Sequence, residues 1–437
     1  MRQLNLYIQH PISKGCTAAL LLVFSSLLLA EPLLSLNRVE TIALNDDPIL
    51  QASELRALSA SQRAIAEGQL ADPTFNLGLF NVPTDNFDIN KNPTTQLRLG
   101  VSQQLAKGDS LRLKTLQGEY VAVAQRERGA FLRRSLLKDV RLQFLEVLYQ
   151  QKALNILREN RRYFVDLLTN SNHLYAVGRA NQQAVLQAKL ELSRLDDQIN
   201  QGLNQFEIDR AVLAKWVPLA NNANLLDSLP ELPNFSSLEN LEQNLQKHPA
   251  IAIEDAYIAI AKQGVHLAEE QYKPAYSLGV EYRKRFGNEP SGSERADMLA
   301  AMLSVEMPIF TEKRQDKHLA ARQYDYQAVK LKRLDSLRDI RQKLRREYGN
   351  WLRLQQRSAR YDQQLLKQAA AHTSAALSAY QSGVVDFSTL MYARISELET
   401  RLHACRVAID LLKAQSNVLF YSVEKTQTEQ GSKYVQQ

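Results

Sequence analysis

Residues 276–283 read Tyr-Ser-Leu-Gly-Val-Glu-Tyr-Arg, with apolar and polar side chains in strict alternation. Because successive side chains of a β-strand point to opposite faces, this stretch predicts a strand with one apolar and one polar face. The apolar face carries Tyr276, Leu278, Val280 and Tyr282, and the polar face carries Ser277, Gly279, Glu281 and Arg283. Alternation over about ten residues, with aromatic residues near the ends, is typical of a lipid-facing strand in a membrane β-barrel. A half-buried strand of a soluble sandwich is the alternative for any single stretch of this kind.

Three further stretches alternate in the same way, and together they predict two strand pairs. The predicted pairs are 74–82 with 95–105, and 275–286 with 297–310. The connections within the pairs are rich in Pro, Gly, Asn, Asp and Ser, as is typical of water-exposed loops. Four strands are too few to close a barrel around a channel, and open sheet edges are not tolerated in lipid. Several chains are therefore expected to contribute to one barrel.

Two long stretches without proline predict very long helices. No proline occurs between Pro93 and Pro218, or after Pro308. Apolar residues recur there at spacings of three and four on a charged background, which is typical of amphipathic, coiled-coil-like helices. At 1.5 Å per residue, a run of some 65 residues spans on the order of 100 Å.

The chain contains two copies of one structural unit. His248-Pro249 follows Asp47-Pro48 at an offset of 201 residues, and Tyr380–Gly383 follows Tyr175–Gly178 at an offset of 205. Each copy is predicted to contain a helix, a strand pair and a long helical hairpin with a glycine at its tip. The first copy covers 31–217 with its tip near 175–183, an equatorial linker covers 218–247, and the second copy covers 248–423 with its tip near 380–388.

Both ends of the chain fall outside this repeat. Residues 1–30 have the pattern of a secretory signal peptide, with an apolar core at 18–29 and a small residue, Ala30, at the expected cleavage point. Removing them would leave Cys405 as a single cysteine, so no intramolecular disulfide is expected. Residues 424–437 are predicted to be a polar tail.

Charge and motif content exclude several classes of function. The net charge is +7, but basic and acidic residues are interleaved along the helices, so no nucleic-acid partner is expected. His403 and Cys405 lie two residues apart, which places them on different faces of a helix, so no metal site is expected. No cluster of acid, base or nucleophile and no phosphate-binding loop is present, so we expect neither catalytic residues nor a cofactor.

The order of these elements resembles the TolC family of outer-membrane efflux channels over nearly the whole chain. Residues 36–50 resemble the family's opening helix and its proline break, and 175–188 and 380–393 resemble its hairpin turns. The resemblance implies a mainly α fold with membrane β-structure: long helical hairpins plus four strands per chain. It also implies a homotrimer that forms a twelve-stranded barrel in outer-membrane lipid and a helical tunnel through the periplasm. The partners would be a periplasmic adaptor protein and an inner-membrane pump of the resistance-nodulation-division type.

Within the family, residues 82–88 and 95–103 resemble the branch that serves heavy-metal efflux pumps. That resemblance implies heavy-metal cations as the cargo. Alternative hypotheses are a periplasmic adaptor or structural coiled-coil protein, and an outer-membrane duct for type I protein secretion or drug efflux.

The resemblance assigns positions in each tip. A glycine ends a helix at low steric cost, and family members dock the adaptor at this turn. The implied docking residues are Gly178, Arg179, Ala180, Gly383, Val384 and Val385. The positions near the periplasmic entrance are Ala184, Gln187, Asp386, Thr389 and Tyr392. Asp386 is the only carboxylate close to either turn, so an acidic ring at the entrance is not expected.

The polar strand faces are expected to line the lumen of the barrel. This assigns Arg98, Glu281, Arg283 and Glu306 to the lumen. Their mixed signs predict a wide and weakly selective pore.

Overall fold

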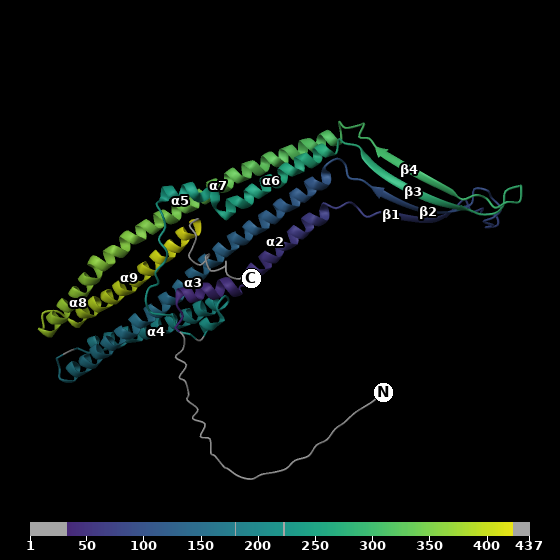
Figure 1. The fold of residues 1–437 in the computed structure, drawn as a ribbon. Coiled ribbons are helices and arrows are strands. Elements are labelled where there is room, and N and C mark those ends of the chain that lie inside the picture. The colour runs from purple at the N-terminus through teal and green to yellow at the C-terminus, as the bar shows by residue number, and fades with distance from the viewer. Residues whose placement is uncertain (1–32, 180, 222, 423–437) are drawn as a thin grey trace, which may run out of the picture.

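A computed structural model describes residues 33–422 except 180 and 222, and it shows an elongated molecule with strands at one end and two helical hairpin tips at the other (Figure 1). The predicted signal peptide, 1–30, and the predicted polar tail, 424–437, lie outside the described residues. No helix among the described residues combines the length and the apolar character needed to cross a membrane.

Long helices make up most of the structure. The first copy contains α1 (Leu36–Asp46), α2 (Pro48–Glu67), α3 (Ser110–Ala176) and α4 (Gln182–Ala214). The second contains α6 (Pro249–Glu270), α7 (Gln315–Arg360), α8 (Leu366–Gln381) and α9 (Phe387–Tyr421). The linker between the copies holds the short helix α5 (Leu238–Asn244) and two 3₁₀ turns, Pro218–Asn221 and Leu245–Lys247.

The helices pack as a layer four wide in each half of the body. In the half next to the strands, α2 packs on α3, α3 on α6, and α6 on α7 (Figure 1). In the half next to the tips, α4 packs on α3, α3 on α9, and α9 on α8. The helices at the two edges of the layer are therefore α2 and α7 near the strands, and α4 and α8 near the tips.

The strands form one antiparallel sheet in the order β1-β2-β3-β4. Their bounds are β1 (Thr74–Phe80), β2 (Gln96–Gln104), β3 (Ala275–Arg285) and β4 (Met298–Glu306). β2 and β3, one from each copy, join the two copies, with Val101 opposite Val280. β1 and β4 are the edge strands.

Strand β4 ends earlier than the alternation predicts. The sequence favours a strand up to residue 310, but β4 ends at Glu306. Pro308 follows at once, and a proline has no backbone N–H to donate to a strand ladder. The apolar residues beyond it, Ile309 and Phe310, are exposed.

The largest buried cluster lies around the middle of the molecule, where α1, α3, α9 and the linker meet. It includes Val39, Phe144, Leu148, Leu213 and Ile409. A buried ion pair crosses this region, because Arg141 on α3 donates to both carboxylate oxygens of Glu40 on α1, at 2.7 and 3.3 Å. This cluster and the ion pair thus fix α1 and the linker to the long helix α3.

The long helix of the second copy contains a π turn that the sequence did not predict. Residues Tyr361–Leu365 form this turn between α7 and α8. The three parts are 46, 5 and 16 residues long and together equal the 67 residues of the continuous α3. The π turn is therefore not caused by an inserted residue. The long helices of the two copies have the same length and differ in local winding.

Candidate functional site

The two hairpin tips are built on the same helix-ending motif. Gly178 and Gly383 have φ angles of +74° and +75°, a conformation that glycine adopts without strain. In the first tip the Gly178 N–H donates to Tyr175 O at 3.0 Å, and Arg179 N–H donates to Leu174 O at 2.8 Å. This pair of bonds is a Schellman motif, which satisfies the last carbonyls of the helix.

The second tip repeats the motif. Gly383 N–H donates to Tyr380 O at 3.0 Å, and Val384 N–H donates to Ala379 O at 2.9 Å. No atom lies within 4 Å of a Cβ built at either glycine. These glycines are therefore required by the backbone turn rather than by close packing.

The helices that leave the tips begin with matching caps. The side chain of Asn181 accepts a hydrogen bond from Ala184 N at 2.9 Å, and that of Asp386 accepts one from Thr389 N at 2.8 Å. The Thr389 hydroxyl also donates to Asp386, at 2.6 Å. These hydrogen bonds, the one from the Thr389 side chain foremost, lower the pKa of Asp386. The one carboxylate near the turns thus serves as the N-cap of α9.

A groove of about 700 Å³ lies between the two tips. It brings together five of the residues assigned from the sequence: Arg179, Ala184, Gly383, Val385 and Asp386. Leu174, Leu377 and Phe387 supply an apolar wall. The groove therefore offers an apolar surface with a polar rim.

Three of the other assigned tip residues are Gln187, Val384 and Tyr392. Gln187 accepts a hydrogen bond from Ser388 at 2.9 Å, which ties α4 to α9. Val384 at the turn and Tyr392 on α9 are 77% and 68% exposed. Ala180 lies outside the described residues.

The sheet has one apolar and one polar face, as its pairing register shows. Residues directly opposite each other on neighbouring strands share a face. Most apolar residues of the four strands fall on one side, and several are largely exposed, such as Leu77 at 73% and Leu299 at 75%. The apolar residues on the other side are Phe80, Ala275, Met298, Ala300 and Met302. The register places Arg98, Glu281, Arg283 and Glu306 together on the opposite side.

On the polar face, Glu281 lies between two arginines. Its Oε1 is 3.8 Å from Arg98 Nε and 2.5 Å from Arg283 Nε. The Arg98 guanidinium also lies over the ring of Phe80, 4.2 Å from its centroid. Glu306, at the helix end of the sheet, pairs with Lys107 at 3.1 Å. The four residues thus belong to two separate ion-pair groups at opposite ends of the sheet.

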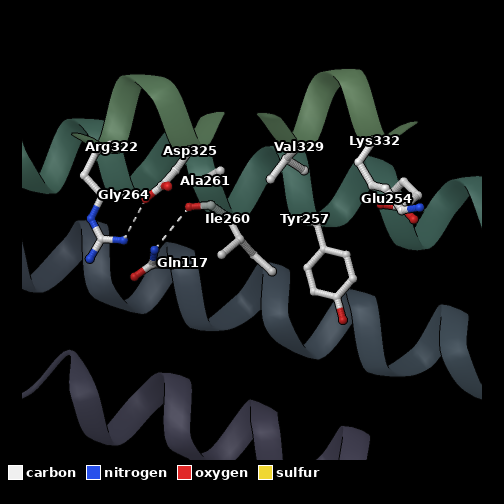
Figure 2. A pocket seen from close by; sticks show the side chains of 10 residues that line it. All are labelled: Gln117, Glu254, Tyr257, Ile260, Ala261, Gly264, Arg322, Asp325, Val329 and Lys332. Carbon is white, nitrogen blue, oxygen red and sulfur yellow. Dashed lines mark hydrogen bonds and ion pairs between the residues drawn. The ribbon is translucent and has the colours of Figure 1, made fainter. Parts of the chain in front are cut away.

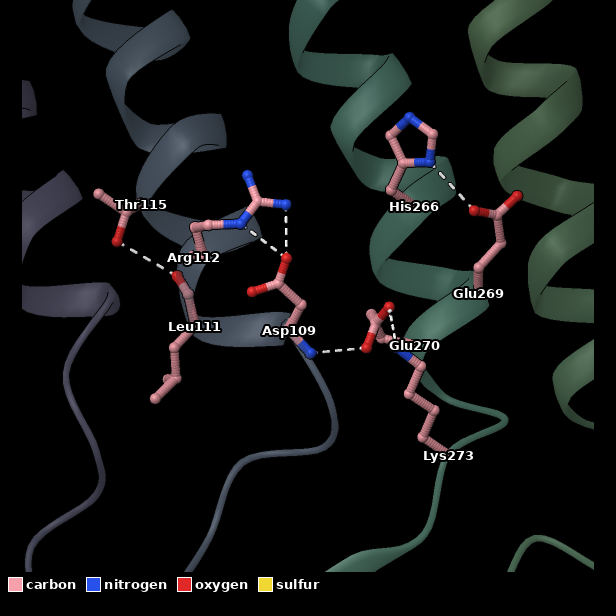
Figure 3. A network of polar contacts seen from close by, with 8 residues as sticks. All are labelled: Asp109, Leu111, Arg112, Thr115, His266, Glu269, Glu270 and Lys273. Atoms are coloured by element: carbon pink, nitrogen blue, oxygen red, sulfur yellow. Dashed lines mark hydrogen bonds and ion pairs between the residues drawn. The ribbon is translucent and has the colours of Figure 1, made fainter.

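Charged residues also join the sheet end of the helices (Figure 3). Glu270 at the end of α6 accepts a hydrogen bond from Asp109 N at 2.7 Å and pairs with Lys273 at 2.8 Å. Asp109 in turn pairs with Arg112 in the first turn of α3. This network holds the start of α3 against the end of α6, where strands change to helices.

A second groove, of about 490 Å³, lies where α3, α6 and α7 meet (Figure 2). Its polar groups have partners within the chain. Gln117 donates to Ile260 O at 3.1 Å, Arg322 pairs with Asp325 at 3.6 Å, and Glu254 accepts from Ser336 at 3.1 Å. Across the described part of the chain, no three His, Cys, Asp or Glu residues are grouped to hold a metal ion. This groove supplies packing surface rather than a set of reactive groups.

Sequence reasoning missed two features of these sites. The N-cap role of Asp386 could have been found, because an Asp two to three residues after a helix-ending glycine and just before an apolar residue is a common helix start. The position of Phe80 beneath Arg98 could not, because it depends on the pairing of β1 with β2 and on the path of an aromatic side chain.

No family model and no curated protein sequence matches this chain. Solved structures do match it along most of its length. The outer-membrane channel OprN is 16% identical, with 88% of this chain and 89% of that chain covered and a TM-score of 0.72. The CmeC outer-membrane channel of Campylobacter jejuni is 13% identical, with 91% and 88% covered and a TM-score of 0.74. CusC, whose structures concern folding and transmembrane channel formation, is 15% identical, with 88% and 91% covered and a TM-score of 0.73.

Proposed function

We propose that this chain, which has the fold of the TolC-family outer-membrane channels, is the outer-membrane component of a tripartite efflux system. It would act as a passive exit duct and not as an enzyme. The observation that carries the proposal is the sheet, whose apolar face is exposed in all four strands and whose opposite face holds the charged residues Arg98, Glu281, Arg283 and Glu306. A lipid-facing barrel wall has this distribution. The sheet continues into helices on the order of 100 Å long, enough for a periplasmic tunnel.

The open edges of the sheet support a homotrimer. β1 and β4 each have a neighbour on one side only. In lipid their unpaired N–H and C=O groups would each cost several kcal/mol, so an edge strand has to find a partner. Pairing β4 of one chain with β1 of the next, around three chains, would give a closed barrel of twelve strands.

The edge helices carry matching apolar stripes, which support the same assembly. On α2, Leu55, Leu58 and Ile65 are exposed, and on α7, Tyr324 and Leu331 are exposed. Spacings of three and seven residues place each set on one face of its helix. If α7 of one chain packs against α2 of the next, both stripes leave water, and the layer of four helices per chain closes into a tunnel of twelve.

The hairpin tips are the proposed docking site for a periplasmic adaptor, which would hold an inner-membrane pump of the resistance-nodulation-division type. The exposed Val384 and the groove between the tips give an apolar surface with polar residues around it. A helical hairpin of a partner would bury such a surface. Gly178, Arg179, Gly383 and Val385 would lie at this contact, and Ala184, Gln187, Thr389 and Tyr392 near the tunnel entrance.

Heavy-metal cations are the cargo suggested by residues 82–88 and 95–103, and drug efflux is the alternative. A deletion strain tested against copper, silver, zinc, cobalt and cadmium, and against dyes, detergents and antibiotics, separates the two. Selective metal sensitivity that the intact gene restores supports metal efflux, whereas sensitivity to organic compounds alone removes that assignment.

The duct itself is tested by fractionation. We expect an oligomer in the outer-membrane fraction whose migration changes on heating. A protein that high salt washes from the membranes would instead fit a periplasmic adaptor or a structural coiled-coil protein.

A further inference from the structure

The polar face of the sheet changes character towards its outer end, the end away from the helices. The register defines rows across the strands, and the three outermost rows hold the bulky and charged residues. These rows are Phe80–Gln96–Arg285, then Gly78–Arg98–Arg283–Met298, then Asn76–Gly100–Glu281–Ala300. Nearer the helices the polar face carries only uncharged residues until Glu306 in the last row. The charge of this face is thus concentrated near the outer loops.

The two arginines of the second row are directly opposite each other. Arg98 on β2 is the cross-strand partner of Arg283 on β3. Like charges in directly opposite positions destabilise a sheet. A single carboxylate, that of Glu281, is shared between them, at 3.8 and 2.5 Å. The pair therefore keeps one positive charge in excess.

The position of Arg98 is fixed by its neighbours. Its guanidinium stacks on the Phe80 ring at 4.2 Å. That ring lies so close to Gly78 that a Cβ there would be 2.8 Å from it. Gly78 thus leaves the space in which Phe80 supports Arg98, and Gly100 in the next row lies opposite Glu281. The arginine is held on the polar face instead of turning towards the loops.

Most of the other charged residues near the outer end have local partners. Arg285 lies 3.7 Å from Glu289, and the Arg295 guanidinium donates to the backbone carbonyls of Asn90, Asn92 and Phe286. In the loops, Asp85 pairs with Lys91 at 3.4 Å, and Asp297 pairs with Lys284 at 3.4 Å. Asp88 accepts a hydrogen bond from Asn90 N at 2.9 Å. Asp85, Glu289 and Asp297 are therefore paired with cations other than Arg98 and Arg283, whereas Asp88 is bonded to the backbone of its own loop.

We propose that Arg98 and Arg283 form a positively charged ring in the outer part of the lumen, which favours the exit of anionic solutes over cations. The proposal rests on the trimeric duct proposed above, in which three copies of the pair would face one lumen. Rings of arginine or lysine select anions in pores, and a low-dielectric wall strengthens their field.

This ring bears on the class of cargo, and it replaces the weakly selective pore predicted from the mixed signs, because Glu306 belongs to a separate ion-pair group. It repels free divalent cations and attracts negatively charged solutes near the outer end of the path. Neutral or anionic cargo therefore fits the duct better than bare metal ions, which sets this inference against the heavy-metal assignment.

Ion selectivity of the purified oligomer in planar lipid bilayers tests the ring. In a potassium chloride gradient, the reversal potential of the wild-type channel should show chloride crossing severalfold more readily than potassium. The double variant R98Q/R283Q should lose that preference, and E281Q, which removes the shared carboxylate, should increase it. A cation-selective wild-type channel, or variants that conduct with unchanged selectivity, would overturn the proposal.

Matched control variants distinguish a failure of the arginine-ring proposal from a failure of the proposed duct function. K284Q removes a positive charge from the same region of β3 but from the opposite face, so its selectivity should equal that of the wild type. R98K/R283K keeps the charge and should keep the chloride preference. If R98Q/R283Q does not assemble, E281Q and K284Q still decide the outcome. Absence of any conductance from assembled wild-type oligomers would count against the duct, not against the ring.

Discussion

Asp47 and His248 perform the same task in the two copies of the repeat. Each precedes a proline and caps the helix that follows: Asp47 accepts from Ile49 N at 2.8 Å, and His248 Nδ1 accepts from Ala250 N at 3.2 Å. Only His248 is fully buried, against Phe131, Phe420 and Tyr421. Its Nε2 donates to Phe420 O at 3.1 Å, so both ring nitrogens are used when the ring is neutral. The second cap thereby also ties the start of α6 to the end of α9.

The buried His248 predicts a loss of stability in mild acid. Burial lowers the pKa of His248 from 6.5 to about 4. Between these two values the unfolded chain binds more protons than the folded one, so stability falls as the pH drops from 6.5 towards 4. By linkage the loss is about 3 kcal/mol. Thermal unfolding of the purified protein at several pH values measures it. H248N keeps a capping side chain without a titrating ring, so its unfolding temperature should change less over this range; an equal change would assign the effect to other groups.

The buried pair Glu40–Arg141 predicts a large cost for removing one partner. Both side chains are less than a tenth exposed. E40A would leave the Arg141 guanidinium buried without its carboxylate, at a cost of about 3–5 kcal/mol in the free energy of unfolding. E40M/R141M replaces both charges with apolar groups and should recover most of that loss. Thermal unfolding of the two variants checks this, and equal melting temperatures for E40A and the wild type would show that the pair contributes little.

The apolar face of β3 predicts where charge is tolerated. A charge at Leu278 or Val280 would lie in lipid and cost about 2–4 kcal/mol near the membrane midplane. L278K and V280K should therefore reduce the yield of assembled oligomer in the outer-membrane fraction. The matched control is S277K, one residue away on the polar face. Equal yields for L278K and S277K would contradict the assignment of the two faces.

The tip glycines predict a separation of assembly from transport. Neither glycine has a neighbour within 4 Å of a Cβ position, so G178L and G383L should assemble normally. A bulky side chain and a strained turn at the docking surface should nevertheless abolish efflux, since a positive φ costs other residues about 1–2 kcal/mol. Growth of a complemented deletion strain in the presence of an effluxed compound reads this out. G178N and G383N are the controls, because asparagine tolerates the turn, and transport by both leucine variants would exclude the tips as the docking site.

Much of the fold was predictable because its signals are local. Alternation along residues 276–283 and the absence of proline after Pro308 depend only on neighbouring residues, and both identified the right element type. The π turn at Tyr361–Leu365 was not predictable in this way. Its residues include no glycine or proline, and the matching stretch of the first copy, 156–160, is continuous α-helix.

The site could be predicted only in part, because some of its contacts depend on residues that are distant in the sequence. The alternation of side chains along each strand was enough to place Arg98 and Glu281 on the polar face. The stacking of Phe80 beneath Arg98 required the register of two strands that are joined by a loop of irregular shape. The docking role of the tips stays a prediction, because a turn defined by its own backbone bonds does not identify its partner.

The π turn also has a consequence for symmetry. The long helices of the two copies have equal length but wind differently, and the tips differ in their turn residues, Arg179 in one and Val384 in the other, so the two copies are not equivalent. Around a ring of three chains, two kinds of tip would alternate. A partner that recognises one kind would meet a threefold pattern, and a partner that accepts both would meet a pseudo-sixfold one. The difference between the two copies can therefore set the stoichiometry with which a partner binds this end of the molecule.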